Sequence, residues 1–227
     1  GMTSSKAHPY LASFQRVGMV AKDPASGRYG LGPAAIRYGL AGINQLGVVD
    51  VAREPMEELQ EKTGLSITLT IWGNHGPTII QKLDSEMPVP LMVRVGYVLP
   101  LLSSASGRIF LAHLPHLEWA PVAMREIGFD RSKLESTEKL IEEVRRAGVA
   151  VSNSLLNQGF FGISAPVFDH GGRIAAAVTV LGLRGEIDIT ATGAVAQAVR
   201  ETGRHISVAL GYVEQENGLE PSPKGKE

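Results

Sequence analysis

The chain contains no cysteine and no long run of apolar residues. The lack of cysteine excludes disulfide bonds, thiol nucleophiles and metal sites built on cysteine. A helix that spans a bilayer needs about 20 predominantly apolar residues in succession, and no segment of this chain approaches that length. We therefore expect a cytoplasmic protein without a membrane partner.

A surplus of charge of one sign is also missing. The 22 Lys and Arg residues and the 23 Asp and Glu residues leave a formal net charge of −1. No global basic field attracts nucleic acid, so any affinity for DNA has to come from a local cluster of basic residues. The 227 residues, of which 44% are hydrophobic and 26 are glycine, are typical of an α/β protein with one medium domain and a small one.

The chain also lacks the usual signatures of catalysis. It has no Gly-x-Ser-x-Gly nucleophile elbow, and His113 and His116 are separated by Pro115 without a third ligand at a spacing that suits zinc. Asp169 and His170 fall in a predicted turn, where an Asp side chain normally bonds its own backbone. We expect no enzyme activity, no metal and no cofactor.

Capping and basic residues occur together near the N-terminus. Residues 3–5 are Thr and Ser, which favour a helix N-cap, Leu11 and Phe14 share one helical face, and Gly18 is a helix stop. Residues 23–27 have turn chemistry and predict a hairpin between two short strands. A helix followed by such a wing is typical of a DNA-binding head, in which basic side chains meet phosphates. The basic side chains of this segment are Lys6, Arg16, Lys22 and Arg28.

Hydrophobic periodicity predicts the elements of the rest of the chain. Recurrence at helical spacing predicts helices over residues 34–46, 48–63, 105–113, 136–147 and 190–212. Alternation predicts strands over residues 66–72, 78–83, 149–152, 160–168 and 173–181, with residues 91–95 after an irregular link. The polar tail, residues 214–227, contains Pro and Gly, so we expect it to be disordered.

A central, mainly antiparallel sheet with flanking helices predicts a ligand pocket between the sheet and its loops. The best candidate wall is the loop over residues 99–107, because its small residues let a ligand approach the backbone and the following helix offers N–H groups to a carboxylate. The alternative is that residues 103–107 only cap and pack that helix. Trp72 and Met92 are possible further walls, although a large aromatic residue on an alternating strand is also typical of the core.

Five separated motifs occur in a characteristic order along the chain. They are Lys6-Ala7-His8 with Tyr10-Leu11, Ser26-Gly27-Arg28-Tyr29 with Leu31-Gly32-Pro33, Leu99-Pro100-Leu101 before Ala105-Ser106-Gly107-Arg108, Gly148-Val149-Ala150, and Ser164-Ala165-Pro166-Val167-Phe168-Asp169. Their order and spacing resemble those of the IclR-type family of bacterial transcriptional regulators, from about Ser4 to about Tyr212. The resemblance implies an α+β fold, in which a winged helix-turn-helix reads DNA, a linker helix follows, and a larger GAF-like domain binds a small effector.

The resemblance also implies a division of the chain. Residues 1–32 are expected to form a partial winged helix-turn-helix, residues 33–47 a linker helix, and residues 48–213 the effector-binding domain. The expected function is that of a ligand-responsive DNA-binding transcriptional regulator, which binds its operator as a homodimer or homotetramer. The expected effector is a small organic or aromatic acid.

Candidate site residues are carried over from the family, position by position. The DNA-binding positions are Lys6, His8, Tyr10 and Arg28. The effector-binding positions are Ala105, Ser106, Ser152, Asn153, Gly162, Thr179 and Leu181. Relatives often carry acidic residues near Ser152, and their absence here indicates a more apolar or anionic effector.

Two departures from the family pattern affect the head. A winged helix-turn-helix needs a helix and a turn before its recognition helix, whereas this chain starts almost at that helix, and Gly1 before Met2 resembles the remnant of a tag. Pro9 also stands where the family commonly has Arg, which removes a cationic side chain that could touch DNA. The alternative is therefore a free-standing module that binds small molecules or mediates oligomerisation and carries a non-functional head.

Overall fold

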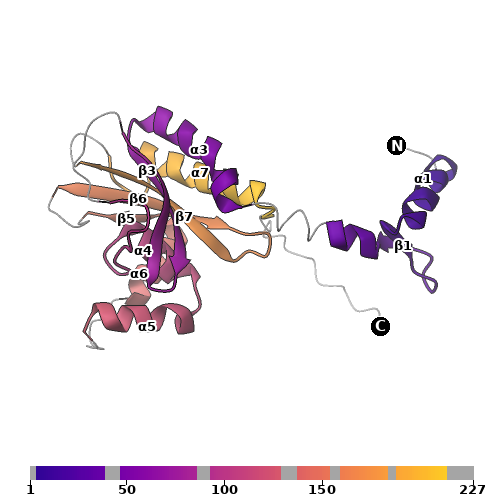
Figure 1. Cartoon of the computed structure of the whole chain (residues 1–227), viewed down its shortest axis with the longest axis horizontal. Helices are drawn as coiled ribbons and strands as arrows, with labels where there is room; N and C mark the ends of the chain where they lie inside the picture. The colour runs from indigo at the N-terminus through magenta and orange to yellow at the C-terminus, as the bar shows by residue number, and fades with distance from the viewer. Residues whose placement is uncertain are drawn as a thin grey trace, which may run out of the picture. The chain divides into compact units, whose positions relative to one another are not determined.

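The chain divides into two compact units, residues 1–47 and residues 48–227 (Figure 1). The computed structural model describes residues 4–38, 47–85, 93–128, 137–153, 159–183 and 188–213. The tail over residues 214–227, for which we expect disorder, lies outside these residues. Within them, no helix combines the length and the hydrophobicity needed to cross a membrane.

The described part of the N-terminal unit begins with a helix and a hairpin. Helix α1 (Ser4–Arg16) precedes strands β1 (Val20–Lys22) and β2 (Tyr29–Leu31), which pair antiparallel. Gly18 ends the helix in the left-handed conformation, with φ of 73°, as its sequence position predicts. The helix and the hairpin predicted from the capping and turn residues are both confirmed.

Two consecutive helical segments follow the hairpin in sequence. Residues 33–38 are helical, and the remainder of the helix predicted over residues 34–46 falls outside the described residues. Helix α3 (Val48–Thr63) has the predicted bounds and is followed by Gly64, whose φ is 66°. Its side chains Ala52, Met56 and Leu59 are buried, which is the spacing of one helical face.

The larger unit is built on a five-stranded sheet in which every pairing is antiparallel. Its strands lie in the order β4-β3-β7-β6-β5, so the expected mainly antiparallel sheet is confirmed. Their bounds are β3 (Ser66–Gly73), β4 (Gly76–Leu83), β5 (Ala150–Ser152), β6 (Phe160–Phe168) and β7 (Ile174–Leu183).

Residues 93–99 depart from the predicted strand over residues 91–95. Residues 93–95 are not in a strand, and residues 91–92 lie outside the described part of the chain. Hydrogen bonds to the outer edge of β4 are instead made a few residues later, because Ile79 N donates to Tyr97 O at 3.0 Å and Leu99 N to Pro77 O at 2.7 Å. This segment therefore covers the free edge of β4.

Four further helices belong to the described part of this unit. They are α4 (Ala105–His113), α5 (His116–Glu126), α6 (Thr137–Ala147) and α7 (Ala194–Ala209). Helix α4 has its predicted bounds, α6 is one residue shorter than predicted, and α7 begins four residues later and ends three residues earlier than predicted. Helix α5 is absent from the prediction, in which Pro115 indicates a helix end. In the structure Pro115 occupies the N-cap position of α5, where a missing N–H does no harm.

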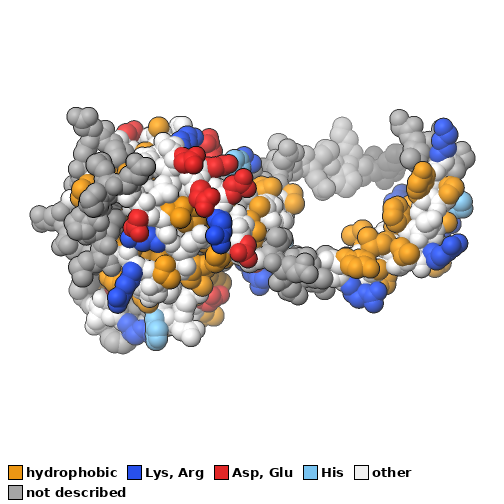
Figure 2. Space-filling model, turned by 45° about the horizontal axis from the view of Figure 1, so that its top comes forward, with side chains coloured by type: hydrophobic (Ala, Val, Ile, Leu, Met, Phe, Trp, Pro, Cys, Tyr) orange, Lys and Arg blue, Asp and Glu red, His pale blue; other side chains and the backbone are white. Residues whose placement is uncertain are grey.

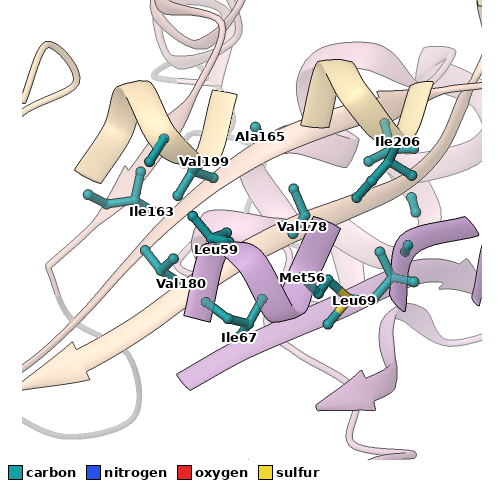
Figure 3. Close-up of a cluster of buried hydrophobic side chains, with 14 of the residues drawn as sticks. Met56, Leu59, Ile67, Leu69, Ile163, Ala165, Val178, Val180, Val199 and Ile206 are labelled. Carbon is teal, nitrogen blue, oxygen red and sulfur yellow. The ribbon is translucent and has the colours of Figure 1, made fainter. Parts of the chain in front are cut away.

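Each face of the sheet has its own hydrophobic core. Helices α3 and α7 lie side by side over one face, and α4, α5 and α6 lie on the other side (Figure 1). Figure 3 shows Met56 and Leu59 of α3 and Val199 and Ile206 of α7 packed against side chains of β3, β6 and β7. Full burial of one such side chain contributes about 1.5–3 kcal/mol, so this layer contributes strongly to the stability of the sheet.

Candidate effector site and DNA-binding unit

A row of polar side chains crosses the sheet on the face opposite α3 and α7. The strand register places Lys82 opposite Thr68, Thr68 opposite Thr179, and Thr179 opposite Ser164. Directly paired residues of antiparallel strands project to the same face. We call these four side chains the polar row, and they come from four different strands.

Hydroxyl groups join the polar row to helix α4. Thr179 Oγ1 donates to Ser164 Oγ at 2.8 Å, and Ser106 Oγ of α4 lies 2.8 Å from Thr179 Oγ1. A hydroxyl group carries a single proton, so the contact between Ser106 and Thr179 has Ser106 as its donor. Ser106 therefore keeps its acceptor lone pairs available for a further donor.

Thr68 and Thr70 of β3 have unpartnered hydroxyl groups. Their exposed fractions are 1% and 0%, and neither Oγ1 has a hydrogen-bond partner among the described residues. An unsatisfied buried hydroxyl group costs about 1–3 kcal/mol, and buried polar groups in proteins are nearly always paired. These two hydroxyl groups therefore mark the β3 part of this face as a place that suits the polar atoms of a small molecule.

Most of the sequence-predicted effector residues lie on or against this face. Ser106 contacts Thr179 directly, and Ala105 precedes it at the start of α4. Leu181, Gly162 and Ser152 form a second row beside the first, because the register pairs Leu181 with Gly162 and Gly162 with Ser152. Asn153 differs, since it follows the end of β5 and its side chain is exposed.

The predicted wall loop is held to strand β5 from one side. Ser152 Oγ donates to Ser103 O at 2.6 Å, so this hydroxyl group already has a partner in the loop. Arg108 donates from Nε to Leu102 O at 3.1 Å and from Nη1 to Val151 O at 2.6 Å. Burial lowers the pKa of the Arg108 guanidinium, and the carboxylate of Glu143 opposes that shift.

Glu126 of α5 holds the same loop from the other side. Its carboxylate accepts the N–H of Leu101 at 2.6 Å and that of Leu102 at 3.1 Å. Ser104 is the N-cap of α4, and its Oγ accepts the N–H of Gly107 at 2.9 Å. The capping alternative therefore describes Ser104 and Gly107, whereas Ser106 points toward the sheet.

Four polar residues of this face are not among the effector-binding positions predicted from the sequence: Thr68, Thr70, Ser164 and Lys82. A signal for the first two exists in the order Ser66-Ile67-Thr68-Leu69-Thr70, where hydroxyl and aliphatic side chains alternate. Trp72 packs with the core on the α4 side, its ring 5.7 Å from that of Phe110, and Met92 lies outside the described residues. Trp72 therefore has the core position that its size favours.

The two histidines considered as metal ligands, His113 and His116, contact different aromatic rings. The His113 ring meets Phe168 edge-on at 5.1 Å, and the His116 ring meets Trp119 at 4.6 Å. In the part of the chain that the structure describes, no three or more His, Cys, Asp or Glu side chains form a group that could hold a metal ion.

Asp169 has the predicted turn role. Its Oδ1 accepts the N–H groups of Gly171 at 2.8 Å and Arg173 at 3.0 Å. Burial alone would raise the pKa of Asp169, but these hydrogen bonds and the Arg173 guanidinium hold it below its ordinary value.

The N-terminal unit carries the candidate DNA-binding residues on exposed positions. Lys6, His8 and Tyr10 lie on α1, and Arg28 lies in the hairpin turn. Lys6 and Tyr10 are four residues apart and so share one side of the helix, whereas His8 faces a different side. Residues 4–38 contain five Lys and Arg side chains and a single acidic one, Asp23. Figure 2 shows that these basic side chains lie among exposed hydrophobic ones.

Comparisons with known proteins agree with this arrangement. The family model for the bacterial transcriptional regulator IclR C-terminal domain matches residues 40–208. Over 217 residues the chain is 26% identical to the HTH-type transcriptional regulator KipR of Bacillus subtilis, and the alignment covers 93% of this chain and 86% of KipR. It is also 26% identical to the DNA-binding transcriptional repressor YiaJ of Escherichia coli, with 93% of this chain and 78% of YiaJ covered.

A solved structure shares the fold over nearly the whole chain. The crystal structure of Pseudomonas aeruginosa HmgR superposes with a TM-score of 0.87 and 35% sequence identity, covering 95% of this chain and 88% of HmgR. The matched family and the curated relatives are transcriptional regulators rather than enzymes. This chain therefore belongs to the IclR family of DNA-binding bacterial transcriptional regulators.

Proposed function

We propose that the protein is a ligand-responsive regulator whose effector is a small organic or aromatic acid bound against the polar row. The observation that carries this proposal is the pair of buried hydroxyl groups without partners, on Thr68 and Thr70, next to the bonded hydroxyl groups of Thr179 and Ser106. A ligand with carboxylate or hydroxyl oxygens would satisfy Thr68 and Thr70, and a ligand hydroxyl could donate to Ser106. Buried polar groups of this kind supply orientation and specificity in otherwise apolar ligand sites.

The charge of the site favours an acid over an amine. None of the residues in the polar row or in the second row beside it is acidic. Helix α4 also starts beside the polar row, where Ser106 contacts Thr179. The dipole of a helix is positive at its N-terminus, which favours a nearby anion. Leu181, Ile79 and Leu99 are buried beside the hydroxyl groups and supply an apolar wall for the body of the effector.

The effector acts on DNA binding through the segment between the two units. We propose a partial winged helix-turn-helix over residues 1–32, a linker helix over residues 33–47 and an effector-binding domain over residues 48–213. An effector can change operator binding only if it binds one arrangement of the protein better than another, and a difference of about 1–3 kcal/mol makes a useful switch.

DNA binding is assigned to the N-terminal unit. Lys6, His8 and Tyr10 of α1 are proposed to lie near the DNA, with Arg28 of the wing on a phosphate. Ile36 and Tyr38 in the helical residues 33–38 are exposed, which suits a contact with a second copy. A two-fold symmetric dimer, alone or within a tetramer, would match a palindromic operator.

A thermal-shift measurement with defined acids tests this proposal. The panel contains benzoate, 4-hydroxybenzoate, lactate and succinate, applied to the whole chain and to Thr179→Val, which removes the central hydroxyl group. A bound acid at about 100 times its Kd stabilises the folded state by roughly 2.7 kcal/mol, which raises the Tm by about 5–10 °C for a chain of this size. We expect the rise in the parent and its loss in Thr179→Val.

Thr202→Val is the matched control, because Thr202 is a buried threonine of α7 on the opposite side of the sheet. It should lower the Tm without changing the response to the acid. An equal response in Thr179→Val and the parent would place the effector elsewhere, and a panel without any response in the parent would count against an acid effector.

A further inference from the structure

We propose that Lys82 is the residue that receives the negative charge of the effector, so that the site selects acids over their neutral analogues. This inference rests on the proposed function, because it places a charge-selecting group in the proposed effector site. It adds a residue that none of the seven family-derived effector positions includes. It also predicts which end of the effector lies at which end of the polar row.

Lys82 is unusually well covered for a lysine at the edge of a sheet. Its side chain is only 14% exposed, and the register pairs it with Thr68. Its sequence neighbour Leu83 packs into the core under α3, so Lys82 projects to the opposite face, where the polar row lies. The ammonium therefore belongs to the face that carries the unpartnered hydroxyl groups of Thr68 and Thr70.

The present partner of Lys82 leaves part of its hydrogen-bonding capacity available. Lys82 Nζ lies 2.6 Å from Asp84 Oδ1, and the Asp84 side chain is 75% exposed. An ammonium has three N–H donors, and an aspartate at the solvent boundary satisfies only some of them. A ligand carboxylate could add a charge-assisted hydrogen bond, which is stronger than a neutral one.

An ordinary surface ion pair offers a contrast. Lys62 of α3 lies 3.5 Å from Glu201 Oε2, with its side chain 64% exposed, so solvent surrounds both partners. Lysine is seldom well buried unless it is paired, and a stem that packs under an exposed head is the structural alternative for Lys82. The nearby threonine hydroxyl groups are what this alternative leaves unexplained, because packing of the lysine stem satisfies neither of them.

The position of Lys82 also orients the effector. At the N-terminus of α4, the N–H of Gly107 is already bonded to Ser104 Oγ and that of Arg108 to Ser104 O. The carboxylate is assigned to Lys82 and Thr68, because an ammonium carries a full positive charge whereas the N-terminus of a helix carries only about half of one. The body of the effector is assigned to the region of Thr179 and Ser106. Two strand spacings, about 10 Å, separate the backbones of Lys82 and Thr179, a span that suits one aromatic ring or a short chain.

Matched acids and amides test this assignment. Titrations compare benzoate with benzamide, 4-hydroxybenzoate with 4-hydroxybenzamide, and lactate with lactamide, on the whole chain. We expect the parent to bind the acid of a pair more tightly than the amide. Lys82→Met, which keeps the length of the stem and removes the charge, should weaken binding of the acid by at least about 10-fold and leave the amide unchanged.

Three further variants separate charge from structure. Lys82→Arg should retain most of the affinity for the acid, because it keeps the charge. Asp84→Asn should strengthen binding of the acid several-fold, because a competing carboxylate is removed, whereas a lysine that only packs its stem would show no such gain. Lys62→Met, the same exchange on the α3 side, should change neither titration.

The outcomes distinguish failure of this inference from failure of the proposed function. Acid binding that survives Lys82→Met but is lost in Thr179→Val overturns the role of Lys82 and leaves the effector site in place. Amides that bind as well as acids overturn charge selection in the same way. If neither acids nor amides bind the parent, both the proposed effector site and the role of Lys82 are rejected.

Discussion

At the scale of single residues, His113 makes the stability of the folded state depend on pH. Burial, and to a smaller extent the charge of Arg145, lower the pKa of His113 to about 4 from its ordinary 6.5. The folded protein therefore holds this histidine neutral, while the unfolded chain binds a proton below pH 6.5. The stability associated with the neutral ring is fully present above that pH and is lost as the pH falls toward 4.

We expect His113 to account for about 2 kcal/mol of the loss in unfolding free energy between pH 7.5 and pH 5. Urea denaturation at the two pH values measures this loss, and His113→Gln should reduce it. His205→Gln, at an exposed position of α7, serves as the control. An identical pH dependence in His113→Gln and the parent would contradict the assignment.

Gly107 is required by a close approach between two backbones. A Cβ at this position would lie 2.3 Å from Leu101 O and 2.5 Å from Pro100 O. The loop cannot easily withdraw, because Glu126 holds the N–H of Leu101. We expect Gly107→Ala to lower the unfolding free energy by about 1–3 kcal/mol, measured by urea denaturation.

Gly30→Ala provides the comparison for Gly107, because nothing lies within 4 Å of a Cβ built there. It should leave the denaturation midpoint nearly unchanged. A Gly107→Ala protein as stable as the parent would show that the loop over residues 99–104 yields more readily than its hydrogen bonds indicate.

The polar row shows how far single residues could be predicted. Ser106 and Thr179 could be named from the resemblance to the family, and the structure brings their hydroxyl groups together. Thr68 and Lys82 could not, because a strand that alternates Thr with Leu and Ile is normally half exposed, with its polar side chains in water. Only the covering of both faces of the sheet turns that alternation into a buried polar row.

At the scale of elements, α5 acts as a support for the loop over residues 99–104. Its Glu126 carboxylate accepts two consecutive backbone N–H groups, those of Leu101 and Leu102. A hydrogen bond to a charged acceptor typically contributes about 1.5–3 kcal/mol. The loop then starts α4 at a fixed place, which positions Ser106 against Thr179.

Removal of this support should loosen the loop. We expect Glu126→Ala to reduce the hydrogen-exchange protection of the Leu101 and Leu102 amides and to lower the unfolding free energy by about 1–3 kcal/mol. Exchange measured by NMR reports the two amides separately. Arg125→Ala, at the preceding exposed position, should have neither effect. Unchanged protection in Glu126→Ala would mean that the loop is held by Arg108 and Ser152 alone.

Element prediction succeeded where local pattern and tertiary packing agree. Helix α3 and strand β6 have the predicted bounds because each has a strong apolar pattern, and α3 also has a helix stop at Gly64. Helix α5 was not predicted, because Pro115 indicates a helix end just before it, although Trp119 and Ala123 of α5 are buried. Packing of these side chains outweighs the missing hydrogen bond at Pro121.

At the scale of the whole molecule, the charge of the chain is divided between its units. The overall net charge of −1 hides a basic N-terminal segment with five cationic side chains against one acidic one over residues 4–38. A sequence-wide sum therefore says little about DNA binding, whereas the segment has the local positive charge that phosphate contacts need. The order of the strands in the larger unit, by contrast, depends on pairings between distant segments that no local pattern contains.

Coupling between the units must be reciprocal if the protein is a ligand-responsive regulator. An acid that changes the Kd for DNA by some factor has to see its own Kd changed by the same factor when DNA is bound. We expect a factor of about 5–150, measured by fluorescence anisotropy of a labelled operator duplex and by titration of the acid with and without that duplex.

Arg28→Ala should weaken DNA binding and reduce its dependence on salt by about one phosphate contact, while leaving the affinity of the DNA-free protein for the acid unchanged. Thr179→Val should do the reverse, with DNA binding retained and its response to the acid lost. An acid that binds the larger unit yet leaves the Kd for DNA unchanged would show that the two units act independently, which is the behaviour of a binding module rather than of a switch.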